Sequence, residues 1–137
     1  MKIFASLILS IFFCLNFQNI SAQNLAPIPA SHPVAVQLKA YNERDIELFM
    51  SAYSDTVKVY NFHGPLNYQG KEEMRKRYTA MFEKTPGLHC ELVSRMVMGN
   101  VVIDQEKVQF QTGKARMDAI AIYKIADGLI YEVRFVK

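Results

Sequence analysis

"LHCELVSRMVMGNVVIDQEKVQFQTGKARMDAIAIYKIADGLIYEVRFV", residues 88–136, is the stretch that decides the fold. Apolar side chains fall at roughly every second position, which is typical of strands. Three short separators of the hairpin-turn kind, "GN", "TGKA" and "ADG", divide the stretch. The pattern predicts an antiparallel meander of four long strands at 88–98, 101–111, 117–125 and 129–136.

The residues before this stretch follow a helical period instead. Apolar side chains three and four positions apart predict two short helices, one from about residue 33 and one capped by Asp45, and a third over 71–84. The β-branched segment 57–60 predicts a short strand, and the glycines at its far side predict a loop over 64–70. Helices followed by a meander indicate an α+β protein. Three helices on one face of a curved, mostly antiparallel sheet would form a cone whose open end is a pocket.

The N-terminal segment has the features of a secretory leader. Lys2 precedes an apolar run that ends near Phe17, and the polar "ISAQ" follows. The run is too short to span a bilayer comfortably. The sequence therefore predicts a signal peptide at 1–23, a proline-containing linker at 24–32 and one domain at 33–137. The mature protein is expected to be periplasmic or secreted, with no membrane attachment.

Composition excludes several classes of function. The formal charge of +3 is too small to indicate a nucleic-acid partner. Cys14 lies in the predicted leader, so the mature chain keeps Cys90 alone and forms no internal disulfide. The three histidines are far apart in the sequence, and no metal-binding motif such as HExxH is present. We expect neither a metal nor another cofactor.

Two carboxylates in "VIDQEKVQF" are candidate catalytic groups. Asp104 and Glu106 are two residues apart on a predicted strand, so they share one face. If that face is concave, both point toward the pocket, and burial with mutual repulsion should raise the pKa of one of them. They would then form an acid/base pair. Alternatively, Val101 and Ile103 mark the inner face and the acids lie in water or at a subunit contact.

The segment "VYNFHG", residues 59–64, supplies a second candidate base. His63 is the only histidine near the expected pocket mouth, and a histidine there could act as a base near neutral pH. The alternative is a solvated loop histidine. Aromatic and amide side chains nearby could hold a ring-shaped ligand, although aromatic residues at such spacings also form ordinary core. The candidate ligand-binding residues are Tyr41, Tyr60, Asn61, Phe62 and Tyr123.

Three segments together resemble a known superfamily: "AYNERDIELFMSAYSDTVKVYNFHGP" at 40–65, "YQGKEEMRKRYTAMF" at 68–82 and "YKIADGLIYEVRF" at 123–135. Their order and spacing are similar to nuclear transport factor 2-like proteins, which include the SnoaL-like and ketosteroid-isomerase-like proteins. The resemblance implies a cone-shaped α+β barrel and frequent dimerisation through the convex face. It places the isomerase base at Asn61, the helical tyrosine at Gln37 and the strand aspartate at Ala119 or Ile120. Because an amide cannot accept a proton at neutral pH, steroid isomerisation by that mechanism is not expected.

Three functions remain open after this comparison. The first is an exported module that binds a small apolar or aromatic molecule, with polar contacts from Tyr41, Asn61 and His63. The second is a cofactor-independent isomerase, cyclase or dehydratase that uses His63 or the Asp104–Glu106 pair as its base. The third is a structural domain that dimerises and fills its pocket with its own methionine and phenylalanine side chains. A homodimer is expected in each case.

Overall fold

The computed structural model describes residues 28–137. The predicted signal peptide and the first residues of the predicted linker lie outside the described residues. The elements, in chain order, are α1 Ser31–Glu43, α2 Ile46–Ser51, β1 Tyr53–Asn61, β2 Leu66–Gln69, α3 Lys71–Lys84, β3 His89–Met98, β4 Val101–Gln109, β5 Met117–Ala126 and β6 Leu129–Val136. Within the described part of the chain, no helix is long and apolar enough to cross a membrane.

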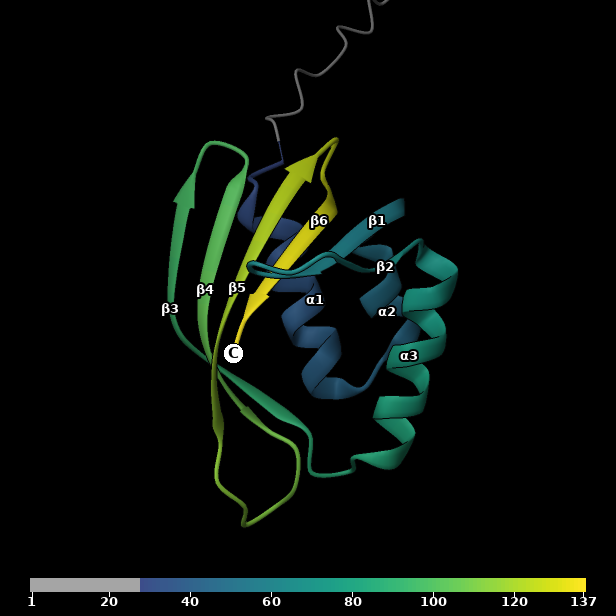
Figure 1. Ribbon diagram of the computed structural model, residues 1–137, viewed down its shortest axis with the longest axis vertical. Helices are drawn as coiled ribbons and strands as arrows, with labels where there is room; N and C mark the ends of the chain where they lie inside the picture. Colours follow the sequence, from purple (N-terminus) through teal and green to yellow (C-terminus); the bar gives the residue numbers. More distant parts are fainter. Residues whose placement is uncertain (1–27) are drawn as a thin grey trace, which may run out of the picture.

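The strands form one six-stranded sheet with the order β2-β1-β6-β5-β4-β3. All neighbouring strands are antiparallel except β1 and β6, which run parallel. Figure 1 shows the three helices together on one side of this curved sheet, which stays open because its outer strands β2 and β3 do not meet. The cone-shaped α+β architecture predicted from the sequence is confirmed.

The first two helices form a tight hairpin that fixes α1 against the sheet. At the end of α1, Arg44 adopts a left-handed conformation (φ 56°), and its N–H donates to the carbonyls of Ala40 and Tyr41. Asp45 then caps α2 by accepting a hydrogen bond from the Leu48 N–H at 3.0 Å. The turn directs Gln37, on the buried side of α1, toward the concave face of the sheet.

The region between α2 and α3 contains more strand than the sequence pattern predicts. Strand β1 begins at Tyr53 rather than Val57, and β2 lies inside the predicted loop. Both extensions come from pairing: β1 lies between β6 and β2, so backbone hydrogen bonds to its neighbours favour extended structure. A four-residue strand has no room for a recognisable alternation of apolar residues, and this is why β2 was missed.

Strand β4 shows which face of the sheet is buried. Val102, Asp104, Glu106 and Val108 are buried, whereas the residues between them are more exposed. The concave face therefore carries the two acids, and the alternative with Val101 and Ile103 inside does not hold. At the sheet edge, β3 leaves several apolar side chains exposed, including Met96 (66%) and Met98 (77%).

Candidate functional site

A cavity of about 160 Å³ lies between the helices and the concave face of the sheet. It reaches the surface near Phe110 and Lys137, which are exposed members of its lining. The walls are mainly apolar and aromatic, with contributions from α1, α3, β1, β3, β4, β5 and β6. The lining consists of Gln37, Leu38, Tyr41, Tyr53, Tyr78, Met81, Cys90, Glu106, Val108, Phe110, Met117, Ala119, Tyr123, Phe135 and Lys137.

Glu106 is the carboxyl group in the cavity wall. It is only 5% exposed. Burial first, and then the negative charge of Asp104, raise the pKa of the Glu106 carboxyl, which is about 7 in the fold against an ordinary value of 4.5. Hydrogen bonds from Tyr123 and Cys90 and the positive charge of Arg95 act in the opposite direction. Near neutral pH both protonation states of this carboxyl are therefore populated.

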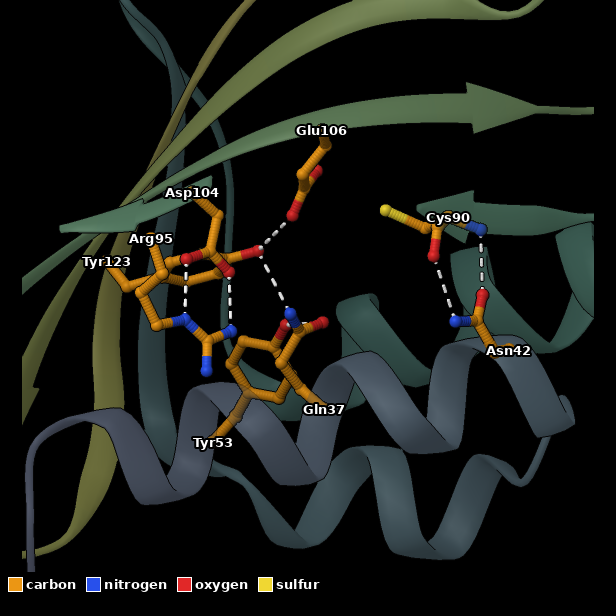
Figure 2. A network of polar contacts seen from close by, with 8 residues as sticks. All are labelled: Gln37, Asn42, Tyr53, Cys90, Arg95, Asp104, Glu106 and Tyr123. Carbon is orange, nitrogen blue, oxygen red and sulfur yellow. Dashed lines mark hydrogen bonds and ion pairs between the residues drawn. The ribbon is translucent and has the colours of Figure 1, made fainter. Parts of the chain in front are cut away.

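A line of buried hydrogen bonds leads to Glu106 (Figure 2). The Tyr123 hydroxyl donates to Glu106 Oε1 at 3.3 Å, and Gln37 Nε2 donates to the Tyr123 hydroxyl at 3.0 Å. Tyr53 completes the line by donating to Gln37 Oε1 at 3.4 Å. Every donor in the line points in the direction of Glu106. The arrangement favours the ionised carboxylate and fixes its orientation.

Two further contacts hold β3 in place beside this line. Arg95 and Asp104 form an ion pair, with the Nε–Oδ1 and Nη2–Oδ2 distances both 2.7 Å. Asn42, near the end of α1, donates to the Cys90 carbonyl at 2.9 Å and accepts from the Cys90 N–H at 2.7 Å. Figure 2 shows that the Cys90 thiol points toward Glu106. Burial is the main cause that raises the pKa of this thiol, so it stays protonated at neutral pH.

The structure brings some of the predicted site residues together. Glu106, Tyr41 and Tyr123 line the same cavity. Asp104 lies on the same face but is fully buried against Arg95 and is not part of the lining. Tyr41 keeps its phenol proton, because burial is the main cause that raises its pKa.

Four other candidates, Tyr60, Asn61, Phe62 and His63, are not among the lining residues, which differs from the expectation. Tyr60 has the guanidinium of Arg134, its β6 neighbour, over its ring at 4.2 Å. Asn61 ends β1 in a turn where its carbonyl accepts from the Gly64 N–H at 3.0 Å. Phe62 and His63 are exposed in that turn, with their ring centres 4.2 Å apart. The return of the chain into β2 carries this segment to the surface.

Sequence reasoning missed Cys90, Arg95 and Tyr53 as parts of the site. A signal for Arg95 was available, because a hairpin turned at Gly99 and Asn100 places Arg95 directly opposite Asp104. No comparable signal exists for Cys90, which a β-bulge brings to this face, or for Tyr53, whose position depends on the pairing of β1 with β6. Among residues 28–137, no group of three or more histidine, cysteine, aspartate or glutamate side chains is placed to hold a metal ion.

The fold and cavity define a class of protein, the nuclear transport factor 2-like cone, and solved structures agree. An uncharacterised cystatin-fold protein of Novosphingobium aromaticivorans superposes with a TM-score of 0.73 at 23% identity, over 80% of this chain and 99% of its own. A candidate polyketide cyclase of Sinorhizobium meliloti gives 0.66 at 16% identity, over 77% and 94%. A candidate ketosteroid isomerase of Kribbella flavida gives 0.64 at 15% identity, over 77% and 75%.

The sequence itself gives a more specific assignment. The SnoaL-like domain model matches residues 34–133, which is most of the chain. The chain therefore belongs to the SnoaL-like domain family. No functionally curated protein matches it.

Proposed function

We propose that this domain binds a small, mostly apolar molecule of about one ring and transfers a proton with Glu106, as a cofactor-independent isomerase, cyclase or dehydratase. The observation that carries the proposal is a carboxyl group in the wall of a small apolar cavity, with a pKa raised to about 7. A general base is most effective when its pKa lies near the working pH.

The size of the cavity supports a ligand of one ring. Its volume is about 160 Å³. An apolar cavity of about 150 Å³ in another protein is large enough for benzene. The lining offers aromatic and aliphatic contacts along most of the wall and polar atoms around Glu106. A ligand would therefore place its polar, reactive end at Glu106 and its apolar body toward the mouth.

The polar groups of the site fit proton transfer. Glu106 would accept a proton from a carbon or oxygen atom of the ligand, while Tyr123 keeps the carboxylate oriented through its 3.3 Å hydrogen bond. The negative charge left on the ligand needs a donor, and Tyr41 lines the same cavity with its phenol protonated. This base differs from the isomerase pattern, in which the corresponding position is Asn61. The cyclase and isomerase names of two structural neighbours belong to the same reaction classes.

A second candidate, a binding module without catalysis, is favoured by Asn61. An amide occupies the position of the isomerase base, and it is exposed. In this case the cavity would hold the same class of ligand, and Glu106 would act only as a hydrogen-bond partner. The third possibility, a domain with a filled interior, fits less well because a cavity of about 160 Å³ remains.

One experiment separates the first two candidates. Cyclohexanone is a ring-sized carbon acid, and NMR in D₂O can follow both its binding and the exchange of its α-protons. If Glu106 is a base, the wild-type protein accelerates exchange with a midpoint near pH 7, and Glu106→Gln abolishes the acceleration. Glu83→Gln, at an exposed position of α3, is the matched control. Binding without exchange would favour the module, and neither binding nor exchange would refute both.

Export and dimerisation are part of the same proposal. The predicted leader at 1–23 supports export, which a mass measurement of protein recovered outside the cytoplasm would test. Exposed apolar residues on β3 and β5, including Met96 and Ile120, support a homodimer formed through the outer face of the sheet. Analytical ultracentrifugation over a range of concentrations would contradict the dimer if it found only monomer.

A further inference from the structure

An ion pair lies on the concave face of the sheet beside the cavity. Arg95 of β3 and Asp104 of β4 stand opposite each other in the ladder. Both oxygens of Asp104 accept from the guanidinium at 2.7 Å. The Asp104 side chain is fully buried, and that of Arg95 is 18% exposed. Neither residue is part of the cavity lining, so the pair lies next to Glu106 without facing the ligand space.

The register of the β3–β4 hairpin places Arg95 opposite Asp104, and a β-bulge further back along β3 brings Cys90 to the same face. In a regular strand, residues five positions apart such as Cys90 and Arg95 point to opposite faces. The register of β3 shifts between Leu92 and Ser94, so Val93 is an extra residue with no partner on β4. As a result, Cys90 and Arg95 both reach the face that carries Asp104 and Glu106. Bulges of this kind are common next to functional sites, where they redirect a side chain.

Stability alone is a poor explanation for this arrangement. Two carboxyls on one buried face repel each other, and each loses its hydration. A buried ion pair is often no more stabilising than apolar residues of similar volume. Arg95 neutralises the charge of Asp104. A second carboxyl, that of Glu106, can therefore lie beside Asp104 with a pKa raised only to about 7.

The surroundings of Glu106 show which groups control its charge. The neutral groups come from α1, α3, β1, β3 and β5, and all of them keep their protons or cannot ionise at neutral pH. The charged groups that shift the pKa of Glu106 are Asp104, which raises it, and Arg95, which lowers it. The titratable and polar groups that contact Glu106 or line its cavity are Gln37 and Tyr41 of α1, Tyr53 of β1, Tyr78 of α3, Cys90 and Arg95 of β3, Asp104 of β4, Tyr123 of β5 and Lys137 after β6.

We propose that Arg95 and Asp104 are positioning residues that act on Glu106 as one unit: the pair fixes the charge beside the Glu106 carboxyl, and neither member exchanges a proton with the ligand. This inference rests on the proposed function, because it takes Glu106 as the group that transfers the proton. The hairpin register that sets Arg95 opposite Asp104 is the backbone feature that makes the unit possible.

The test follows the titration of Glu106 by NMR in the full chain, with ¹³C-labelled glutamate side chains and Glu106→Gln for assignment. Asp104→Asn leaves the positive charge of Arg95 without its partner, so the midpoint of Glu106 should fall. Arg95→Met leaves the negative charge of Asp104, so the midpoint should rise. Each shift should be about tenfold in proton affinity. The double variant should return toward the wild-type midpoint.

Glu47→Gln is the matched control. It removes the carboxylate of another two-contact ion pair, formed with Arg75 between α2 and α3 on the surface. This variant should leave the Glu106 midpoint unchanged. If Arg95→Met does not fold, the shift measured in Asp104→Asn alone tests the proposal. This variant is expected to fold because the amide keeps the shape of the carboxylate. Shifts of opposite sign support the proposal, whereas folded variants with no shift, or with shifts of one sign, overturn it.

Catalysis gives an independent readout. Folded Asp104→Asn should still accelerate α-proton exchange of cyclohexanone, with its pH profile moved in the same direction as the Glu106 midpoint. Loss of exchange at every pH in this variant would make Asp104 a catalytic residue and overturn the proposal. The titration is measured without ligand. A protein that shows the opposite shifts but neither binds nor exchanges cyclohexanone would therefore refute the proposed function and leave the inference about the ion pair intact.

Discussion

Replacing Glu106 by glutamine should stabilise the folded protein at alkaline pH. The pKa of Glu106 is about 7 in the fold against an ordinary value of 4.5. The difference is about 2.5 pKa units, and at about 1.4 kcal/mol for each unit the buried charge costs about 3.5 kcal/mol once it is fully formed. Since Glu106 is 5% exposed, solvent screening reduces this figure little.

The sign of the pH dependence follows from proton linkage. The folded state binds the Glu106 proton more tightly than the unfolded chain does. The contribution of this group to stability is therefore fully present below the unfolded pKa of about 4.5 and is lost as the pH rises through about 7. Glutamine carries no charge at any pH and can still accept the hydrogen bond from Tyr123.

The assay is urea unfolding of the wild type and Glu106→Gln across this pH range. The two free energies of unfolding should be similar near pH 4.5 and should differ by about 3.5 kcal/mol, in favour of the variant, above about pH 8. Other groups titrate equally in both proteins, so their contributions cancel in the difference. Glu83→Gln is the exposed control and should show a flat difference. A variant less stable than the wild type above pH 8 would refute the reasoning, because it would mean that the charge at Glu106 stabilises the fold.

Three further variants test other parts of the site. Asn42→Ala removes two hydrogen bonds to the Cys90 backbone and should lower the free energy of unfolding by about 1–3 kcal/mol in urea titrations; an unchanged value would mean that α1 does not hold β3. Ala119→Leu adds side-chain volume in the cavity wall and should abolish cyclohexanone binding in NMR titrations while changing stability by no more than about 3 kcal/mol, whereas retained binding would place the ligand elsewhere. Tyr123→Phe removes a donor that lowers the pKa of Glu106, so the pH profile of exchange should move to higher pH, and a shift to lower pH would contradict the hydrogen-bond direction.

The sequence pattern predicts the fold well because most of its elements are long and strongly periodic. The third helix matches its prediction over residues 71–84, and the four meander strands agree to within about two residues at their ends. The errors fall where pairing between distant segments overrides local preference. Strand β2 exists because β1 lies beside it, and β1 is extended because β6 runs parallel to it. The local composition of these segments does not indicate either strand pairing.

The sequence predicts the candidate site only where strand alternation determines which face of the sheet a side chain occupies. Asp104 and Glu106 share a face by alternation alone, although the sequence left open which face is concave. The bulge at Val93 changes which residues of β3 point inward, and no pattern in "ELVSRM" marks its position. His63 illustrates the opposite error, since a residue close to a strand end in the sequence can be carried away from the cavity by the return of the chain into β2.

The exposed outer strand also has a chemical consequence. The thioethers of Met96 and Met98 on β3 are open to solvent, so peroxide can reach them from outside. Oxidation to the sulfoxide would turn two apolar thioethers into strongly polar groups on the surface that we propose as the dimer contact. Neither methionine belongs to the cavity wall, so oxidation would alter the outer surface of the sheet and leave the ligand space as it was.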